Sequence, residues 1–159
     1  MKQVIQIRCK NNKKNINVAI GSTLSEVFSQ INLEMPYGPI CAKVNNKVVG
    51  LHYRLYHNKD VEFLDMTSGS GSRNYTRTLF FILSKAVKDL WGDVRVVIDI
   101  PVSNGYYCDL QLGRPVTADD VARLKTRMQE IIDAALPVKR HETTTDEAIE
   151  LFSRHGDTS

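Results

Sequence analysis

Apolar residues in the first 20 positions alternate with polar ones, and this alternation limits the fold of the chain more than any other feature. The alternation is strict at 16–20 and partial at 4–7, and a polar turn at 11–14 separates the two runs. A period of two places the apolar side chains on one face of a strand. The three segments therefore predict an N-terminal β-hairpin.

A helix and further strands are expected after the hairpin. Thr23 and Glu26 stand three residues apart, the spacing of a capping box in which each side chain satisfies a free backbone N–H at a helix start. The apolar spacing that follows predicts a helix over 24–31. This order fits a small mixed sheet on one helix, a β-grasp, in residues 1–66. Its remaining strands are predicted from short apolar runs at 40–44, 48–49 and 61–64.

Small residues at 67–72, Thr-Ser-Gly-Ser-Gly-Ser, predict a flexible linker, because such side chains bury too little surface to offset their ordering entropy. They would divide the chain into one domain at 1–66 and another at 73–159. The second domain is predicted to be α+β, as is the whole chain. Its expected elements are a helix over 73–92, strands at 94–100 and 106–112 around a turn at 103–105, a helix capped by Thr117 and ended by Pro137, a strand at 138–142, and a helix that begins at Thr144 and Glu147 and ends at Gly156.

Positive charge is concentrated in the first domain. The chain has a net charge of +3, and residues 1–66 carry nine Lys/Arg against five Asp/Glu, whereas the remainder carries twelve against thirteen. Lys10, Lys13 and Lys14, beside Arg8, cluster around the first turn. A solvated hairpin tip explains this cluster, and a weak, salt-sensitive RNA contact is the alternative.

No residue pattern in the chain predicts catalysis or a metal site. The three cysteines are far apart and form no CxxC pair, and none of the four histidines has a ligand-like spacing on one helix. Phosphate-binding glycine loops are absent from the sequence. We therefore expect no catalytic residue, no metal and no cofactor in this chain. Neither a signal peptide nor an apolar run of about 20 residues is present, so we expect a cytoplasmic protein without membrane contact.

Several motifs nevertheless resemble a known family. Residues 1–66 resemble a TGS domain. The matching segments are Gly-Ser-Thr-Leu at 21–24, where the helix begins, and Ala-Lys-Val-Asn-Asn-Lys-Val-Val at 42–49. Residues 73–157 resemble the start of the domain that follows TGS in threonyl-tRNA synthetase and hydrolyses mischarged serine. The matching segments are Ala-Val-Lys-Asp-Leu-Trp at 86–91, Ser-Asn-Gly-Tyr-Tyr-Cys-Asp at 103–109, Arg-Pro-Val-Thr at 114–117, Lys-Thr-Arg-Met at 125–128 and Glu-Ala-Ile-Glu-Leu-Phe at 147–152.

The departures from the family pattern bear on function. The family's HxxxH pair falls on Arg77 and Phe81, and its second tyrosine falls on Cys108. Arginine stays protonated and phenylalanine has no lone pair, so neither can bind a metal or act as a base. The family's later Cys/His pair would lie beyond Ser159. An editing hydrolase is therefore disfavoured.

A degenerate version of this region precedes the P-loop domain in bacterial uridine kinase-like proteins, which the segment Tyr75-x-Arg77-x-Leu79-x-Phe81 resembles. By that resemblance, the chain is expected to be a non-catalytic accessory module at the N-terminus of a longer nucleoside kinase-like protein. ATP and Mg²⁺ would belong to the kinase domain, which would be its partner in cis. The alternative is an RNA- or tRNA-binding module of a threonyl-tRNA synthetase-like protein without editing activity.

Arg77 and Lys85 are candidates for an anion site. They stand eight residues apart, so both lie near one face of the predicted helix. A phosphate, a carboxylate or an acidic group of a partner could bind there. An ion pair between Arg77 and a nearby aspartate, such as Asp109, is the favoured structural explanation.

Overall fold

The computed structural model describes residues 3–103, 105–136, 138 and 141–154. The chain divides into two compact units, residues 1–78 and 79–159. The boundary lies within the long helix α2, which spans Gly69–Trp91. No helix in the described ranges has both the length and the apolar character needed to cross a bilayer.

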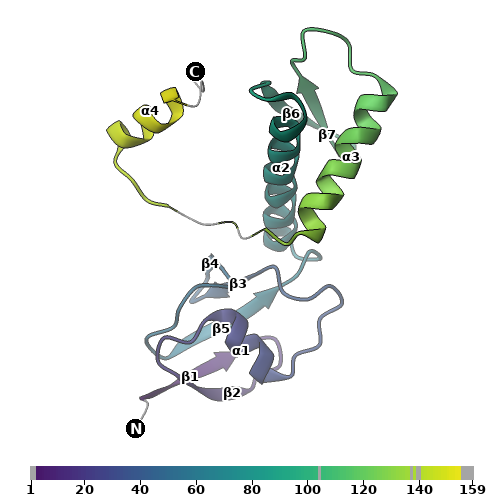
Figure 1. The fold of residues 1–159 in the computed structure, drawn as a ribbon. Helices are drawn as coiled ribbons and strands as arrows, with labels where there is room; N and C mark the ends of the chain where they lie inside the picture. The colour runs from purple at the N-terminus through teal and green to yellow at the C-terminus, as the bar shows by residue number, and fades with distance from the viewer. Residues whose placement is uncertain (1–2, 104, 137, 139–140, 155–159) are drawn as a thin grey trace. The chain divides into compact units, whose positions relative to one another are not determined.

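The first unit contains a five-stranded mixed sheet in the order β2-β1-β5-β3-β4, with helix α1 beside it (Figure 1). β1 pairs antiparallel with β2 and parallel with β5, whereas β3 pairs antiparallel with both β5 and β4. The predicted β-grasp is thus confirmed. Its elements are β1 (Val4–Cys9), β2 (Asn15–Ala19), α1 (Leu24–Ile31), β3 (Cys41–Val44), β4 (Lys47–Gly50) and β5 (Lys59–Leu64).

Helix α1 begins at the capping box that its sequence predicts. The Thr23 side chain accepts from the Glu26 N–H, and the Glu26 carboxylate accepts from the Thr23 N–H at 2.8 Å. The helix ends at Asn32, which takes the left-handed conformation with φ of 47°. The amphipathic stripe between these ends turns its buried side chains toward the sheet, and Phe63 contacts Phe28 edge-on at 5.1 Å between ring centroids.

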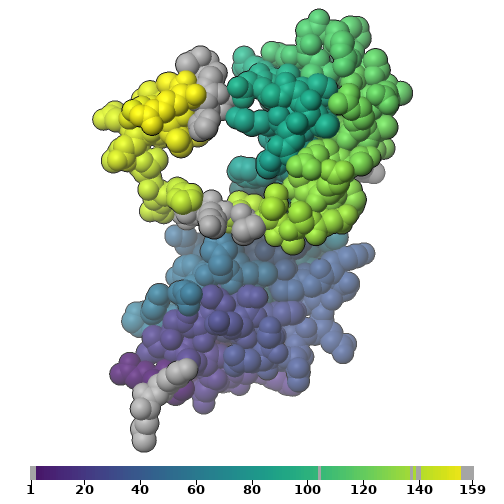
Figure 2. Space-filling model, viewed as in Figure 1, coloured from purple at the N-terminus to yellow at the C-terminus, as the bar shows by residue number. Residues whose placement is uncertain are grey.

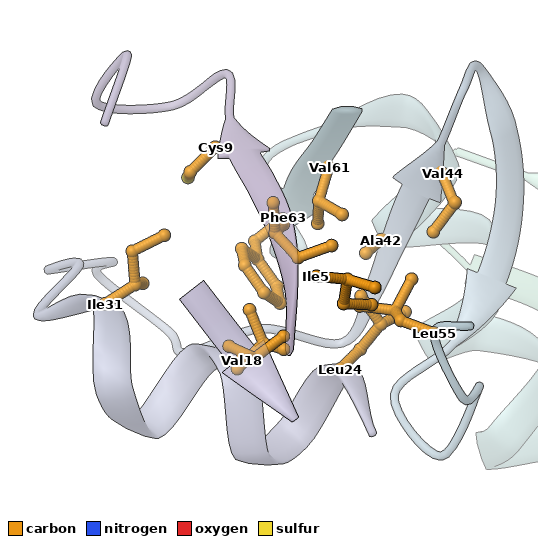
Figure 3. Close-up of a cluster of buried hydrophobic side chains, with 12 residues drawn as sticks. Ile5, Cys9, Val18, Leu24, Ile31, Ala42, Val44, Leu55, Val61 and Phe63 are labelled. Atoms are coloured by element: carbon orange, nitrogen blue, oxygen red, sulfur yellow. The ribbon is translucent and has the colours of Figure 1, made fainter. Parts of the chain in front are cut away.

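The core of the first unit lies between α1 and the sheet (Figure 3). It draws buried side chains from every strand except β4 and from the segment that contains Leu55. The purple-to-blue atoms of this unit form a closely packed body (Figure 2). The buried cluster comprises Ile5, Ile7, Cys9, Val18, Leu24, Val27, Ile31, Ala42, Val44, Leu55, Val61 and Phe63.

The structure corrects the expected linker at 67–72. Helix α2 begins at Gly69, because the Ser68 hydroxyl accepts from the Gly71 N–H at 3.0 Å and so caps the helix start. Asp65 holds the preceding turn, since its carboxylate accepts from the backbone N–H and the hydroxyl of Thr67. The small residues at 67–72 therefore form the turn and first residues of a helix, where the backbone is closely packed, and do not form a flexible linker.

The second unit contains the remainder of α2, a two-stranded antiparallel sheet and two further helices. The Thr117 cap is confirmed, with Asp120 as its capping-box partner, and the predicted strand at 138–142 is wrong at the described residues 138, 141 and 142. The predicted Pro137 and Gly156 ends lie outside the described residues. The elements are β6 (Val96–Val102), β7 (Gly105–Leu110), α3 (Ala118–Asp133) and α4 (Thr145–Arg154).

Candidate nucleic-acid interface

The three lysines singled out from the sequence lie at the turn between β1 and β2. Lys10, Lys13 and Lys14 are all exposed. The Cys9 N–H donates to the Lys14 carbonyl at 2.8 Å and closes the turn, in which Lys13 takes a positive φ of 60°. Lys10 Nζ donates to Asn46 Oδ1 at 3.4 Å, whereas the ammonium groups of Lys13 and Lys14 have no partner among the described residues.

Asn11 anchors this turn to the sheet. Its side-chain Nδ2 donates to the Phe63 carbonyl at 2.9 Å, and its Oδ1 accepts from the Phe63 N–H at 2.8 Å. The amide side chain thereby satisfies both the N–H and the carbonyl of Phe63 in β5, as the backbone of a neighbouring strand would. This pair of hydrogen bonds ties the turn to β5, so the backbone that carries the lysines is held in place.

A polar groove with a volume of about 280 Å³ lies in the same unit, over β1 and the start of β5. Arg8 and Asp60, which line it from neighbouring strands, carry opposite charges, and Lys59 also lines it. Register places Arg8 beside Asp60 and Lys59 beside Ile7 in the parallel pair of β1 and β5. The other lining side chains are all amides: Gln6, Asn15, Asn45 and Asn58.

Two of the amides in the groove are held by the backbone. Asn58 Oδ1 accepts from the Gln6 N–H at 2.9 Å, and Asn45 Oδ1 accepts from the Asp60 N–H at 3.1 Å. The side-chain oxygens are therefore occupied, and the NH₂ groups remain as donors. Arg8, Lys59 and the Asp60 carboxylate make no hydrogen bond or ion pair within the described part of the chain. The groove thus presents cations for phosphate and fixed polar groups for base edges.

The sequence predicted the turn lysines and Arg8 but not the other side of the groove. Gln6 of β1 and Asn58, which directly precedes β5, are 52 residues apart, and the parallel pairing of β1 with β5 brings them together. No local periodicity encodes that pairing. Asn45 lies between the strands predicted at 40–44 and 48–49, but its position at the groove has no local signal.

Arg77 and Lys85 differ in their surroundings. Arg77 is exposed on α2 and has no hydrogen-bonding or ionic partner among the described residues of the first unit. Because Asp109 belongs to the second unit, an ion pair between the two stays a prediction. Lys85 Nζ lies 2.6 Å from Asp89 Oδ1, and Arg127 also donates to this carboxylate. These two cations hold the pKa of Asp89 below its usual range. Lys85 is therefore already paired with a carboxylate, whereas Arg77 has no such pair among the described residues of its own unit.

The chain is similar over most of its length to curated threonine–tRNA ligases. It is 34% identical over 137 residues to the enzyme of Natranaerobius thermophilus and 32% identical over 136 residues to that of Desulforamulus reducens, in each case over 86% of this chain. Threonine–tRNA ligase 2 of Bacillus subtilis is 28% identical over 84% of the chain. No family model matches the chain.

These matches cover about a fifth of the length of the curated relatives, 22% and 21% of the first two enzymes. The chain is homologous to the N-terminal region of threonyl-tRNA synthetase. The mixed α+β architecture agrees with that homology.

Proposed function

We propose that this chain is a non-catalytic RNA-binding module of a threonyl-tRNA synthetase-like protein, with tRNA as the natural class of ligand. The observation that carries the proposal is the anchored basic turn beside the polar groove in the first unit. Cations that are not paired with acidic groups can neutralise phosphates, and this contact supplies most sequence-independent affinity for nucleic acid. Binding to tRNA also implies a cytoplasmic location.

The absence of editing activity follows from residue chemistry. Arg77 and Phe81 occupy the positions that a histidine pair takes in the family that the chain resembles, and both are exposed, Phe81 at 69%. Neither side chain can bind a metal or accept a proton at neutral pH. Seryl-tRNA should therefore be deacylated no faster with the protein than without it, and one equivalent of zinc in the purified protein would contradict this proposal.

RNA binding can be tested by charge reversal at the turn. Changing Lys10, Lys13 and Lys14 to Glu should abolish most binding to tRNA, measured by fluorescence anisotropy. In the wild type, the affinity should fall with salt by a log–log slope of roughly −0.7 to −0.9 for each phosphate contacted.

The matched control reverses three exposed cations of the second unit, Arg95, Arg123 and Lys125, and so changes the net charge by the same amount. It should weaken binding far less than the turn variant. Equal losses in the two variants, or binding that resists salt, would refute this interface.

The substitution pattern on α2 favours a second candidate, an accessory module ahead of a nucleoside kinase domain. Its support is the segment Tyr75-x-Arg77-x-Leu79-x-Phe81 together with the unpaired, exposed Arg77. In that setting Arg77 would bind an anionic group such as a nucleotide phosphate, whereas Lys85 is already paired with Asp89. ATP with Mg²⁺ should then raise the melting temperature of the wild type but not of Arg77→Ala. A phosphate-binding loop encoded downstream of Ser159 would favour the kinase, and a class II synthetase core would exclude it.

A further inference from the structure

Asp60 is an unexpected residue in a groove suited to RNA. Arg8 and Asp60 are neighbours in the parallel pair of β1 and β5. The adjacent residues Ile7 and Val61 are fully buried in the core, so alternation along each strand turns Arg8 and Asp60 to the opposite face of the sheet. A carboxylate repels phosphate, and it requires a different explanation from the cations around it.

A free carboxylate accepts two parallel hydrogen bonds from a group with two adjacent donors. Among the four RNA bases, only guanine presents adjacent N–H donors on its Watson–Crick edge, at N1 and N2. Adenine, cytosine and uracil each place an acceptor beside their donor. The Asp60 carboxylate has no partner among the described residues and so retains both oxygens for such a contact.

The surrounding groups complete the match to guanine. Asn45 is fixed beside Asp60, because its Oδ1 accepts from the Asp60 N–H and its own N–H donates to the Asp60 carbonyl. Its NH₂ group is thus a fixed donor beside Asp60 for the guanine O6 acceptor. Arg8, on the same face of the sheet as Asp60, remains available for a phosphate.

We propose that this groove takes one unpaired guanine nucleotide of an RNA strand, with its base on Asp60 and Asn45 and its phosphate on Arg8; the assignment rests on the proposed RNA binding. A volume of about 280 Å³ is near the lower end of small-molecule sites, which suits a single nucleotide. The nucleotide must be unpaired because the edge read by Asp60 is covered in a duplex.

The test compares short single strands by fluorescence anisotropy: an octamer of uridines, the same octamer with one central guanosine, and the same with one central adenosine. One guanosine should tighten binding roughly tenfold, since a bidentate base contact discriminates by about 1–3 kcal/mol. Asp60→Asn should remove this preference and leave binding to the uridine octamer equal or tighter, because a negative charge is lost. The substitution leaves the backbone bonds to Asn45 in place.

Glu62→Gln is the matched control. Glu62 lies two residues further along β5 and pairs with Lys43 at 3.5 Å, and it does not line the groove. It should keep the guanosine preference. A preference that is missing in the wild type, or that survives Asp60→Asn, would overturn the guanine assignment while leaving RNA binding intact.

Two further outcomes show whether the protein binds RNA at all and whether the groove takes a free nucleotide instead. Binding of none of the strands would refute the proposed function itself. Binding of free GMP that depends on Asp60, without any guanosine preference among the octamers, would overturn the assignment to RNA and indicate a free nucleotide as the ligand.

Discussion

At the scale of single residues, Gly71 shows how a small side chain can be required by backbone packing. A Cβ at this position would lie 1.8 Å from the Asp65 carbonyl oxygen and 2.6 Å from its carbon. Both are backbone atoms and cannot rotate away. The same carbonyl accepts from the Ser68 hydroxyl at 2.9 Å, so the turn into α2 is tied at that point.

Gly71→Ala should therefore destabilise the protein by at least the ~1–3 kcal/mol typical of overpacking, which urea unfolding would measure. Gly69→Ala is the control, because a Cβ there would meet only the flexible end of Arg73 at 3.6 Å. It should be neutral or stabilising by up to ~1 kcal/mol, since alanine favours helix. Equal changes in the free energy of unfolding for the two substitutions would show that the backbone of the turn can shift to accept a Cβ at Gly71.

Asp120 should make stability depend on pH. This buried carboxylate accepts from both Arg114 Nη atoms, at 2.6 and 2.9 Å, and from the N–H and hydroxyl of Thr117. Arg114 first, and then Thr117, hold the pKa of Asp120 well below its usual range. The folded state then binds fewer protons than the unfolded state, so the stabilisation is complete above the unfolded pKa of about 3.9 and is lost as the pH falls.

Asp120→Asn should accordingly have a lower free energy of unfolding than the wild type at pH 7. This difference in free energy, the stability gap, should narrow as the pH falls below 4. Urea unfolding at several pH values measures it. Asp119→Asn changes the exposed neighbour in the same helical turn and should show a much smaller gap. A gap for Asp120→Asn that does not change with pH would contradict the assigned ion pair.

At the scale of elements, α2 contacts both β7 and α3 within the second unit. Phe80 packs edge-on against Tyr106 of β7, with ring centroids 5.0 Å apart. Asp89 accepts from Arg127 of α3 at 2.8 Å, and Arg127 also pairs with Glu130 at 2.7 Å. The ionic contact is exposed and should weaken with salt, whereas the aromatic contact should not.

A double-mutant cycle of Phe80→Leu and Tyr106→Leu should give a coupling of about 0.5–1.5 kcal/mol, the usual value for an edge-to-face aromatic pair. Tyr107→Leu is the comparison, since this neighbouring residue points to the other face of β7 and is 58% exposed. Its coupling with Phe80 should be near zero. Similar couplings for both tyrosines would mean that the helix does not dock on one face of the strand.

At the scale of the whole chain, the two units differ in their cores. The first unit has a continuous cluster of buried side chains, whereas the buried apolar residues described in the second are Ala86, Val87 and Ile131. Strands β6 and β7 keep most of their residues exposed or half-buried. Local opening requires less free energy where fewer apolar contacts are broken.

Hydrogen exchange followed by mass spectrometry should therefore give slower exchange in β1 and β5 than in β6 and β7, when each is compared with its intrinsic rate. Phe63→Ala should remove much of this protection in the first unit, because it empties the centre of the cluster at a cost of about 3–5 kcal/mol. Equal protection of the two sheets in the wild type would contradict the difference in cores.

The sequence by itself determined the local elements of this protein, because their signals act over a few residues. The alternation at 16–20, the Thr23–Glu26 box and the Thr117 cap predicted a hairpin and two helix starts that the structure contains. The local signals at 67–72 predicted a linker, and that prediction is wrong. Gly71 is required there because a Cβ would collide with the backbone carbonyl of Asp65 in the turn before the helix.

Only the tertiary structure decided which polar residues meet. Arg8 lies in β1, Asn45 in the turn between β3 and β4, Asn58 directly before β5 and Asp60 at its start, and these three segments line one groove because β1 and β3 both pair with β5. Parallel pairing joins strands that are distant in sequence, so it depends on how the whole sheet buries its apolar face on α1. No short-range pattern records that choice, which is why the turn lysines could be predicted and Asp60 could not.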